Sequence, residues 1–248
     1  MCRDYIRAVI CVIAGYLLTF LGYMPALDIH ENSIVSIVQQ TLEIGSYKPI
    51  FIISSVFLIS NKLFQLNVGE PVVKKAIHIE GIGIKCGACS FIGFLLFLSP
   101  LLLFFPVITE EETEIMSGVD PHFSVYMGGN ALLVIIFHGI LLFASGVLVS
   151  SLYMISFYRC KDQIRSYLFT LITYQSITFV QSLLAIPNCW KIDNLSSGWF
   201  QSPWATESFV PDILWCLIVV LSISFIVNIF SVLLYHERDD LLKCKETP

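Results

Sequence analysis

Residues 91–105 read FIGFLLFLSPLLLFF, a run without a charged residue and without alternation of apolar and polar positions. A strand of a transmembrane barrel has about 10 residues that alternate between these two kinds of side chain, so the run does not fit a strand. The uncharged stretch extends over 88–108, close to the roughly 20 apolar residues with which a helix crosses a bilayer. It therefore predicts a transmembrane helix and excludes a β-barrel.

The composition of the whole chain agrees with this prediction. Of its 248 residues, 56% are hydrophobic and 13% are charged, whereas about a quarter of the residues of a soluble domain are charged. Such a composition excludes a disordered chain, a nucleic-acid binder and a small disulfide-stapled domain. No hydrophilic stretch is long enough for an appended soluble domain, so residues 1–248 are expected to form one transmembrane domain.

Six stretches approach the length of a membrane span. The second is the weakest of them, because it is short and carries Ser54, Ser55, Ser60, Asn61 and Lys62. The predicted fold is therefore all-α, a polytopic membrane protein with six transmembrane helices. The expected spans are 6–26, 49–66, 88–108, 130–157, 166–186 and 212–235.

The basic residues predict how these spans are oriented, because cytosolic loops of membrane proteins are enriched in Lys and Arg. An arrangement with both termini in the cytosol places 12 of the 14 basic residues there and leaves only Lys48 and Lys191 on the other side. That other side then carries 11 of the 19 acidic residues, so the two faces have opposite charge. A five-span arrangement would scatter the basic residues over both sides.

The triplet Asn194-Leu195-Ser196 is an N-glycosylation sequon in the last non-cytosolic loop of this arrangement. Glycosylation takes place on that side of the membrane in secretory-pathway proteins. Asn194 is therefore predicted to carry a glycan, and its position agrees with the predicted orientation.

Several basic residues lie next to the inner leaflet in the same arrangement. A basic residue beside anionic lipid gains on the order of 1 kcal/mol, so these side chains are candidate contacts for anionic lipid or for a membrane-protein partner. Alternatively, they serve only to set the topology. The candidates are Lys74, Lys75, Lys85, Arg159, Lys161 and Arg165.

Polar side chains inside the spans are further candidates, because such residues are costly in a membrane and mark functional sites. His138 lies roughly 10 Å below the outer end of the fourth span, at a rise of about 1.5 Å per residue. Gln175 and Gln181 belong to a polar stripe on the fifth span, and Asn228 lies in the sixth. These residues either line a polar path or form hydrogen bonds between helices, worth about 0.6–2 kcal/mol per contact.

Neither a cofactor nor a metal is expected. Haem b in a six-span protein needs paired axial histidines on facing helices, and His138 is the only histidine inside a predicted span. No outer cluster has the ligands and spacing of a zinc site. An embedded hydrolase needs two converging acids or a Ser/His/acid set. The predicted spans offer neither arrangement, so an enzymatic role is not favoured.

Five cysteines lie on the predicted cytosolic side, where thiols stay reduced. Cys86-Gly87-Ala88-Cys89 is a single C-x-x-C at the mouth of the third span. Cysteines beside a membrane are common acylation sites, and acylation or plain thiols are favoured here over a redox pair. The candidate acylation sites are Cys86, Cys89, Cys160 and Cys244.

The chain resembles the Frag/DRAM/CWH-type family of six-span membrane proteins in two places. Residues 127–133, MGGNALL, are similar to the glycine-rich start of the fourth span in that family. Trp215 and the segment 235–237 are similar to its aromatic sixth span and the tail that follows. The family places an acidic residue directly before the aromatic of the last span, where this chain has Leu214.

The family includes damage-regulated autophagy modulators, regulators of phosphoinositide-kinase recruitment and a factor for GPI-anchor lipid remodelling. The resemblance implies a non-enzymatic regulator or adaptor that contacts membrane lipids or another membrane protein. It also implies a location in the lysosome, Golgi, ER or plasma membrane. The alternatives are a small transporter or channel with a polar path near His138 and Gln181, and an accessory factor in GPI-anchor remodelling. A nucleic-acid partner is not expected of a chain with a net charge of −5.

Overall fold

The computed structural model describes residues 2–23, 33–34, 37–38, 48–60, 71–110, 131–160, 162–184 and 217–234. The regular structure in these ranges is helical throughout, which confirms the all-α prediction. The labelled helices are α1 (Cys2–Tyr23), α3 (Lys48–Ser60), α4 (Val72–Leu101), α6 (Ala131–Cys160) and α7 (Gln163–Leu183). A last helix, Leu217–Leu234, is called helix 217–234 below.

Four of the described helices are long and apolar enough to cross a membrane: Arg3–Leu21, Val72–Leu101, His138–Cys160 and Leu217–Leu234. α3 has 13 residues, which extend over about 20 Å at 1.5 Å per residue, less than the roughly 30 Å hydrocarbon core. α7 has 21 residues but contains several Ser, Thr and Gln. The described residues therefore have four candidate spans, where six were expected.

The surface of these helices is rich in large apolar side chains. A soluble protein rarely exposes contiguous apolar patches beyond a few hundred Å², so this surface indicates a helical protein embedded in a membrane. The exposed residues include Ile10 and Leu18 of α1, Leu96 of α4, Ile172 and Phe179 of α7, and Phe230 of helix 217–234.

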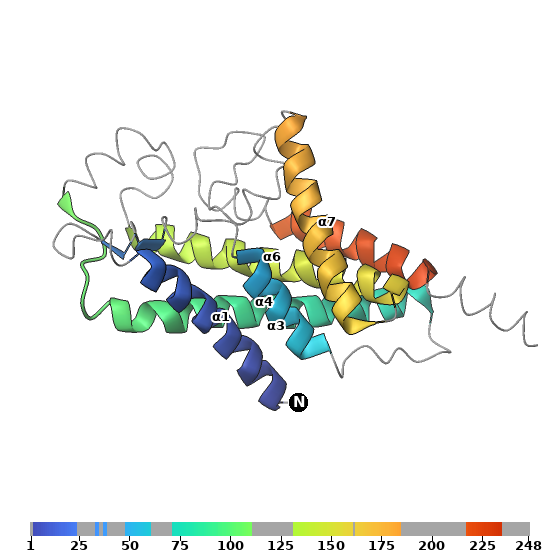
Figure 1. Ribbon diagram of the computed structural model, residues 1–248, viewed down its shortest axis with the longest axis horizontal. Coiled ribbons are helices and arrows are strands. Elements are labelled where there is room, and N and C mark those ends of the chain that lie inside the picture. Colours follow the sequence, from blue (N-terminus) through green and yellow to red (C-terminus); the bar gives the residue numbers. More distant parts are fainter. Residues whose placement is uncertain are drawn as a thin grey trace, which may run out of the picture.

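α4 and α6 run side by side and antiparallel along the long axis of the molecule (Figure 1). Glycines bring their backbones together, because a Cβ on Gly87 would lie 2.5 Å from the carbonyl oxygen of Phe143. A Cβ on Gly146 would likewise lie 2.8 Å from the Cα of Gly87. Small residues allow membrane helices to approach this closely. The other labelled helices pack against this central pair.

α1 packs on α4 along one stripe of side chains and also contacts α3. The ring of Tyr16 lies against Phe94 and Phe97, with centroid distances of 5.7 and 5.2 Å. Val12 lies over Gly93, where a Cβ would be 2.7 Å from its Cγ1. Because residue numbers increase together along both helices in these contacts, α1 and α4 are parallel.

α7 begins at a capped end and crosses α6 at an angle (Figure 1). Asp162 Oδ1 accepts a hydrogen bond from the backbone N–H of Arg165 at 2.7 Å, which satisfies one of the free donors of the first turn. Ser166, Thr170 and Tyr174 follow at four-residue spacing and are buried. α7 therefore presents a narrow, partly polar stripe to its neighbours, while its exposed surface carries large apolar residues together with Arg165, Gln175 and Ser176.

α4 differs most from its predicted span. The span was expected at 88–108 and residues 67–87 in a cytosolic loop, but the helix runs from Val72 to Leu101. Lys and Glu lower the hydropathy of 72–87 without ending a helix, because both are good helix formers. The other predicted spans overlap α1, α3, α6, α7 and helix 217–234, with ends that differ by a few residues.

Candidate functional site

Glu80 of α4 and Asn228 of helix 217–234 meet across a contact between their helices. The amide nitrogen Nδ2 of Asn228 donates a hydrogen bond to Oε2 of Glu80 at 2.7 Å. Asn228 is completely buried and Glu80 is partly buried. The bond joins residues 148 positions apart in the sequence, so it ties α4 to the last described helix.

An apolar cluster lies beside this pair. Ile79, the neighbour of Glu80, and Val232, one turn beyond Asn228, belong to one buried cluster with Met154 and Tyr158 of α6. The cluster therefore holds three helices together at the position where the acid and the amide meet.

The other buried polar side chains of helix 217–234 are satisfied within their own helix. The hydroxyls of Ser224 and Ser231 donate to the carbonyl oxygens of Val220 and Val227, four residues earlier. Asn228 differs from them because its amide reaches a residue of another helix.

Both members of the pair lie inside helices that are long and apolar enough to cross a membrane. Glu80 follows Val72 by eight residues and Asn228 precedes Leu234 by six, so each lies about 9–12 Å from the end of the described part of its helix at 1.5 Å per residue. Ionisable side chains held between such helices are rare and mark functional sites. Glu80 is therefore the strongest functional candidate among the described residues.

Two oxygen atoms of the pair have no hydrogen-bond donor. Oε1 of Glu80 and Oδ1 of Asn228 are inaccessible to solvent, and neither accepts a hydrogen bond within the described ranges. A buried polar atom without a partner costs about 1–3 kcal/mol. The pair thus offers two buried acceptor oxygens, a chemistry suited to a cation or to a hydrogen-bond donor.

The sequence prediction included Asn228 but missed Glu80, because 67–87 was expected to be a loop. The sequence does contain a signal for the helix. Small and apolar residues recur at three- and four-residue spacing from the charged segment 72–87 into the apolar segment 88–101. These residues are all buried in α4, and they include Ala76, Ile79, Gly83, Cys86, Ser90, Phe94 and Phe97.

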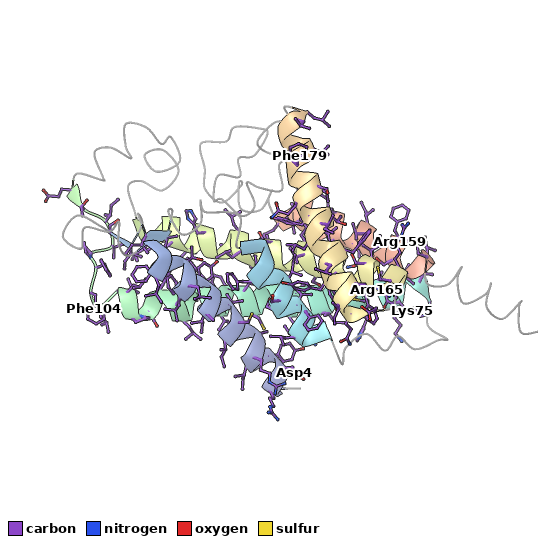
Figure 2. The ribbon with its side chains drawn as sticks, viewed as in Figure 1. Asp4, Lys75, Phe104, Arg159, Arg165 and Phe179 are labelled. Carbon is purple, nitrogen blue, oxygen red and sulfur yellow. The ribbon has the colours of Figure 1, made fainter. Side chains whose placement is uncertain are left out.

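The predicted basic residues lie in three different settings. Lys74, Lys85, Arg159 and Arg165 are exposed, Lys75 is completely buried, and Lys161 lies outside the described residues. In Figure 2, Lys75, Arg159 and Arg165 lie near one another, at the end of the molecule far from Phe104. The burial of Lys75 does not fit a direct lipid contact.

Three of the exposed basic residues share one end of the bundle, where α4 begins, α6 ends and α7 begins (Figure 1). Lys74, Arg159 and Arg165 are called the basic rim below. Lys85 is not part of it, because it lies 11 residues beyond Lys74 on α4, a distance of about 16 Å along the axis.

The other predicted polar residues lie in different environments. His138 is buried in α6, with 1% of its surface exposed, whereas Gln175 is exposed on α7. The side chain of Gln181 and the sequon at Asn194 lie outside the described part of the chain. Of the two residues that were expected to line a polar path, only His138 has a described side chain, and it is buried.

The cysteines on the predicted cytosolic side also differ in exposure. Cys86 and Cys89 are buried in the core, Cys160 at the end of α6 is partly exposed, and Cys244 lies outside the described residues. An acylated thiol has to be accessible at the membrane surface, so Cys160 fits this role better than the buried pair. Within the described ranges, no three His, Cys, Asp or Glu side chains come together as metal ligands.

A small cavity lies between α1, α3, α4 and α6, where Tyr16, Phe51 and Ser90 are among its lining residues. Its volume of about 20 Å³ has room for about one water molecule. This cavity is too small for an organic substrate.

Comparisons with protein-family models, with curated proteins and with solved structures find no match to this chain.

Proposed function

We propose that this chain is a non-enzymatic membrane regulator or adaptor with six transmembrane helices and both termini in the cytosol. The observation that carries the proposal is the basic rim, whose three exposed residues lie at one end of an apolar bundle, where α4 begins, α6 ends and α7 begins. The rim contacts anionic headgroups of the inner leaflet, and the regulatory contact is made on this cytosolic side.

The directions of the helices support a sixfold crossing. α1 and α4 are parallel, so the chain between them has to return across the membrane, and α3 is the long described helix in that segment. Helix 217–234 is antiparallel to α4, because Val232 near its end belongs to the cluster of Ile79 near the start of α4, whereas Val220 near its start belongs to the cluster that includes the later residues of α4.

The second half of the chain supports the same conclusion. α6 and helix 217–234 are both antiparallel to α4 and are therefore parallel to each other. The chain between them has to return as well, and α7 is the described helix that follows α6.

Several polar residues of α3 and α7 are compatible with membrane crossing, because their hydroxyls are hydrogen-bonded. Ser55 donates to the carbonyl oxygen of Ile52 at 2.7 Å, and Thr170 donates to that of Ser166 at 2.7 Å. Ser54 shares a hydrogen bond of 3.1 Å with the hydroxyl of Tyr167, which links the two helices. In a bilayer, polar groups satisfied in this way are tolerated.

The lipid contact is tested with the full-length protein in detergent and a fluorescent short-chain anionic lipid. The triple variant Lys74→Ala/Arg159→Ala/Arg165→Ala loses about 3 kcal/mol of binding free energy at low salt, because each basic residue contributes on the order of 1 kcal/mol. That loss corresponds to roughly a 100-fold weaker affinity.

The matched control is the double variant Lys48→Ala/Lys191→Ala, which removes the two basic residues of the predicted opposite side and leaves the affinity unchanged. Equal affinities of the triple variant and the wild type would show that the rim does not bind anionic lipid.

The proposed location follows the resemblance to the Frag/DRAM/CWH-type family. Imaging of the full chain with a carboxyl-terminal tag beside organelle markers separates its branches. A lysosomal signal supports an autophagy modulator, an ER or Golgi signal supports a factor in GPI-anchor remodelling, and a surface signal supports a phosphoinositide-linked regulator. A signal confined to mitochondria contradicts all three.

A further inference from the structure

We propose that Glu80 and Asn228 form a buried binding site between two helices for a monovalent cation, either a proton or a sodium ion. The site joins α4 to helix 217–234 through the 2.7 Å hydrogen bond from Asn228 Nδ2 to Glu80 Oε2. It is separate from the basic rim, and it does not depend on the regulatory role proposed above.

A positive charge would satisfy the two oxygen atoms of the pair that lack a hydrogen-bond donor. The amide nitrogen of Asn228 is the donor of the bond, and the atoms that remain, Glu80 Oε1 and Asn228 Oδ1, are both acceptors. Both are inaccessible to solvent and have no donor among the described residues. A carboxylate in an apolar bundle with a single hydrogen bond is costly, and a bound cation supplies the missing partner.

Either cation suits this chemistry. A proton on Oε1 turns that oxygen into a donor, while Oδ1 of Asn228 is an acceptor in need of one. A sodium ion takes carboxylate and amide oxygens as direct ligands, because hard cations prefer oxygen. No redox or group-transfer step is involved, since the cation binds and leaves unchanged.

The charged neighbours on α4 do not replace such a cation. The residues that share a helix face with Glu80 at three- and four-residue spacing are Ala76, Ile77, Gly83 and Ile84, and none of them is charged. Lys75 and Lys85 lie five residues away in either direction and His78 two residues away, spacings that turn them at least about 140° around the helix from Glu80.

The neighbouring helices also carry few titratable groups near the site. α6 contributes Tyr158, which belongs to the same buried cluster as Ile79, and the buried Tyr153, followed by the exposed Arg159. The described residues of helix 217–234 include no ionisable side chain. Glu80 is therefore the group whose charge a cation at this position would balance.

The rival explanation is a hydrogen bond that only holds two helices together, for which about 0.6 kcal/mol is typical. The variant Glu80→Gln distinguishes the two explanations. A glutamine keeps an oxygen to accept from Asn228 Nδ2 and gains an amide N–H₂ as a donor, so it imitates the cation-loaded site without binding a cation. A merely structural pair would give the wild type and Glu80→Gln the same response to cations.

The experiment measures thermal unfolding of the full-length protein in detergent, in two series. One series lowers the pH in sodium-free buffer, and the other replaces N-methylglucamine with sodium at fixed alkaline pH and constant ionic strength. At ten times its dissociation constant, a bound cation raises the Tm of a chain of this size by roughly 3–5 °C. The wild type shows this rise, and Glu80→Gln does not.

The two series identify the cation. A rise confined to the pH series indicates a proton, and a rise in the sodium series indicates sodium. Glu110→Gln is the matched control, because Glu110 is an exposed carboxylate outside the site, and it behaves as the wild type does. Parallel curves for wild type and Glu80→Gln in both series would overturn the proposal.

A second variant keeps the proposal testable if Glu80→Gln fails to fold. Asn228→Leu removes the amide oxygen from the site but retains a side chain of similar size. It shifts the midpoint of the cation response by at least tenfold in cation concentration. An unchanged midpoint in Asn228→Leu would also overturn the proposed site.

Discussion

Single glycines set the distance between α4 and α6. Gly87 faces the backbone of α6, where its missing Cβ leaves space for the carbonyl oxygen of Phe143. Gly81 lies on the same helix, but a Cβ added there would meet nothing within 4 Å. The two glycines therefore provide a matched pair with opposite expected effects.

Gly87→Ala is predicted to destabilise the bundle. Its Cβ would lie 2.5 Å from the backbone oxygen of Phe143, and a backbone atom cannot move aside without separating the helices. Overpacking of this kind costs about 1–3 kcal/mol. Gly81→Ala instead stabilises by up to about 1 kcal/mol, because alanine is the better helix former. Thermal unfolding of the two purified variants measures both effects, and shifts of the same sign would contradict the prediction.

The pairing of Glu80 with Asn228 was beyond sequence reasoning for a physical reason. Hydropathy and periodicity describe one helix at a time, whereas this hydrogen bond joins residues 148 positions apart. Asn228 could be predicted as a candidate because it interrupts an apolar helix. Its partner could not, since the choice of partner depends on how α4 and helix 217–234 pack.

At the scale of elements, α7 depends on its amino-terminal cap. Asp162 accepts from the backbone N–H of Arg165, and loss of such a cap costs about 1 kcal/mol. Asp162→Ala is therefore expected to increase amide hydrogen exchange in residues 163–166 by roughly fivefold, as measured by mass spectrometry. Asp162→Asn retains the acceptor and protects these amides. Equal exchange in the two variants would show that the cap does not hold the first turn.

The helices differ in how well the sequence predicts them. α6 and helix 217–234 are almost purely apolar, so hydropathy finds them with ends close to those observed. The first half of α4 carries Lys74, Lys75, Glu80 and Lys85. These charges lower the mean hydropathy of the segment, so hydropathy alone predicts a loop there. Periodicity is the better guide there, because a helix that is buried on one side can carry charges on the others.

At the scale of the whole molecule, the long helices exceed what a bilayer requires. α4 and α6 each have 30 residues, about 45 Å at 1.5 Å per residue, against a hydrocarbon core of roughly 30 Å. Such helices tilt or project beyond the core. Projection of the whole excess of about 15 Å at the end that carries the basic rim places Lys74, Arg159 and Glu80 at headgroup level, with Glu80 still hydrogen-bonded to Asn228.

The number of crossings can be tested in the acidic segment 111–130. If α3 and α7 both cross, this segment lies on the same side as Asn194, whereas with only four crossings it lies in the cytosol. A glycosylation sequon introduced within 111–130, in an Asn194→Gln background, is therefore predicted to be modified and to give a glycosidase-sensitive shift in mass. A sequon in the tail 235–248 is the control and stays unmodified. If the introduced sequon remains unmodified while the native Asn194 carries a glycan, α3 and α7 do not cross. The parallel directions of α1 and α4, and of α6 and helix 217–234, would then need another explanation.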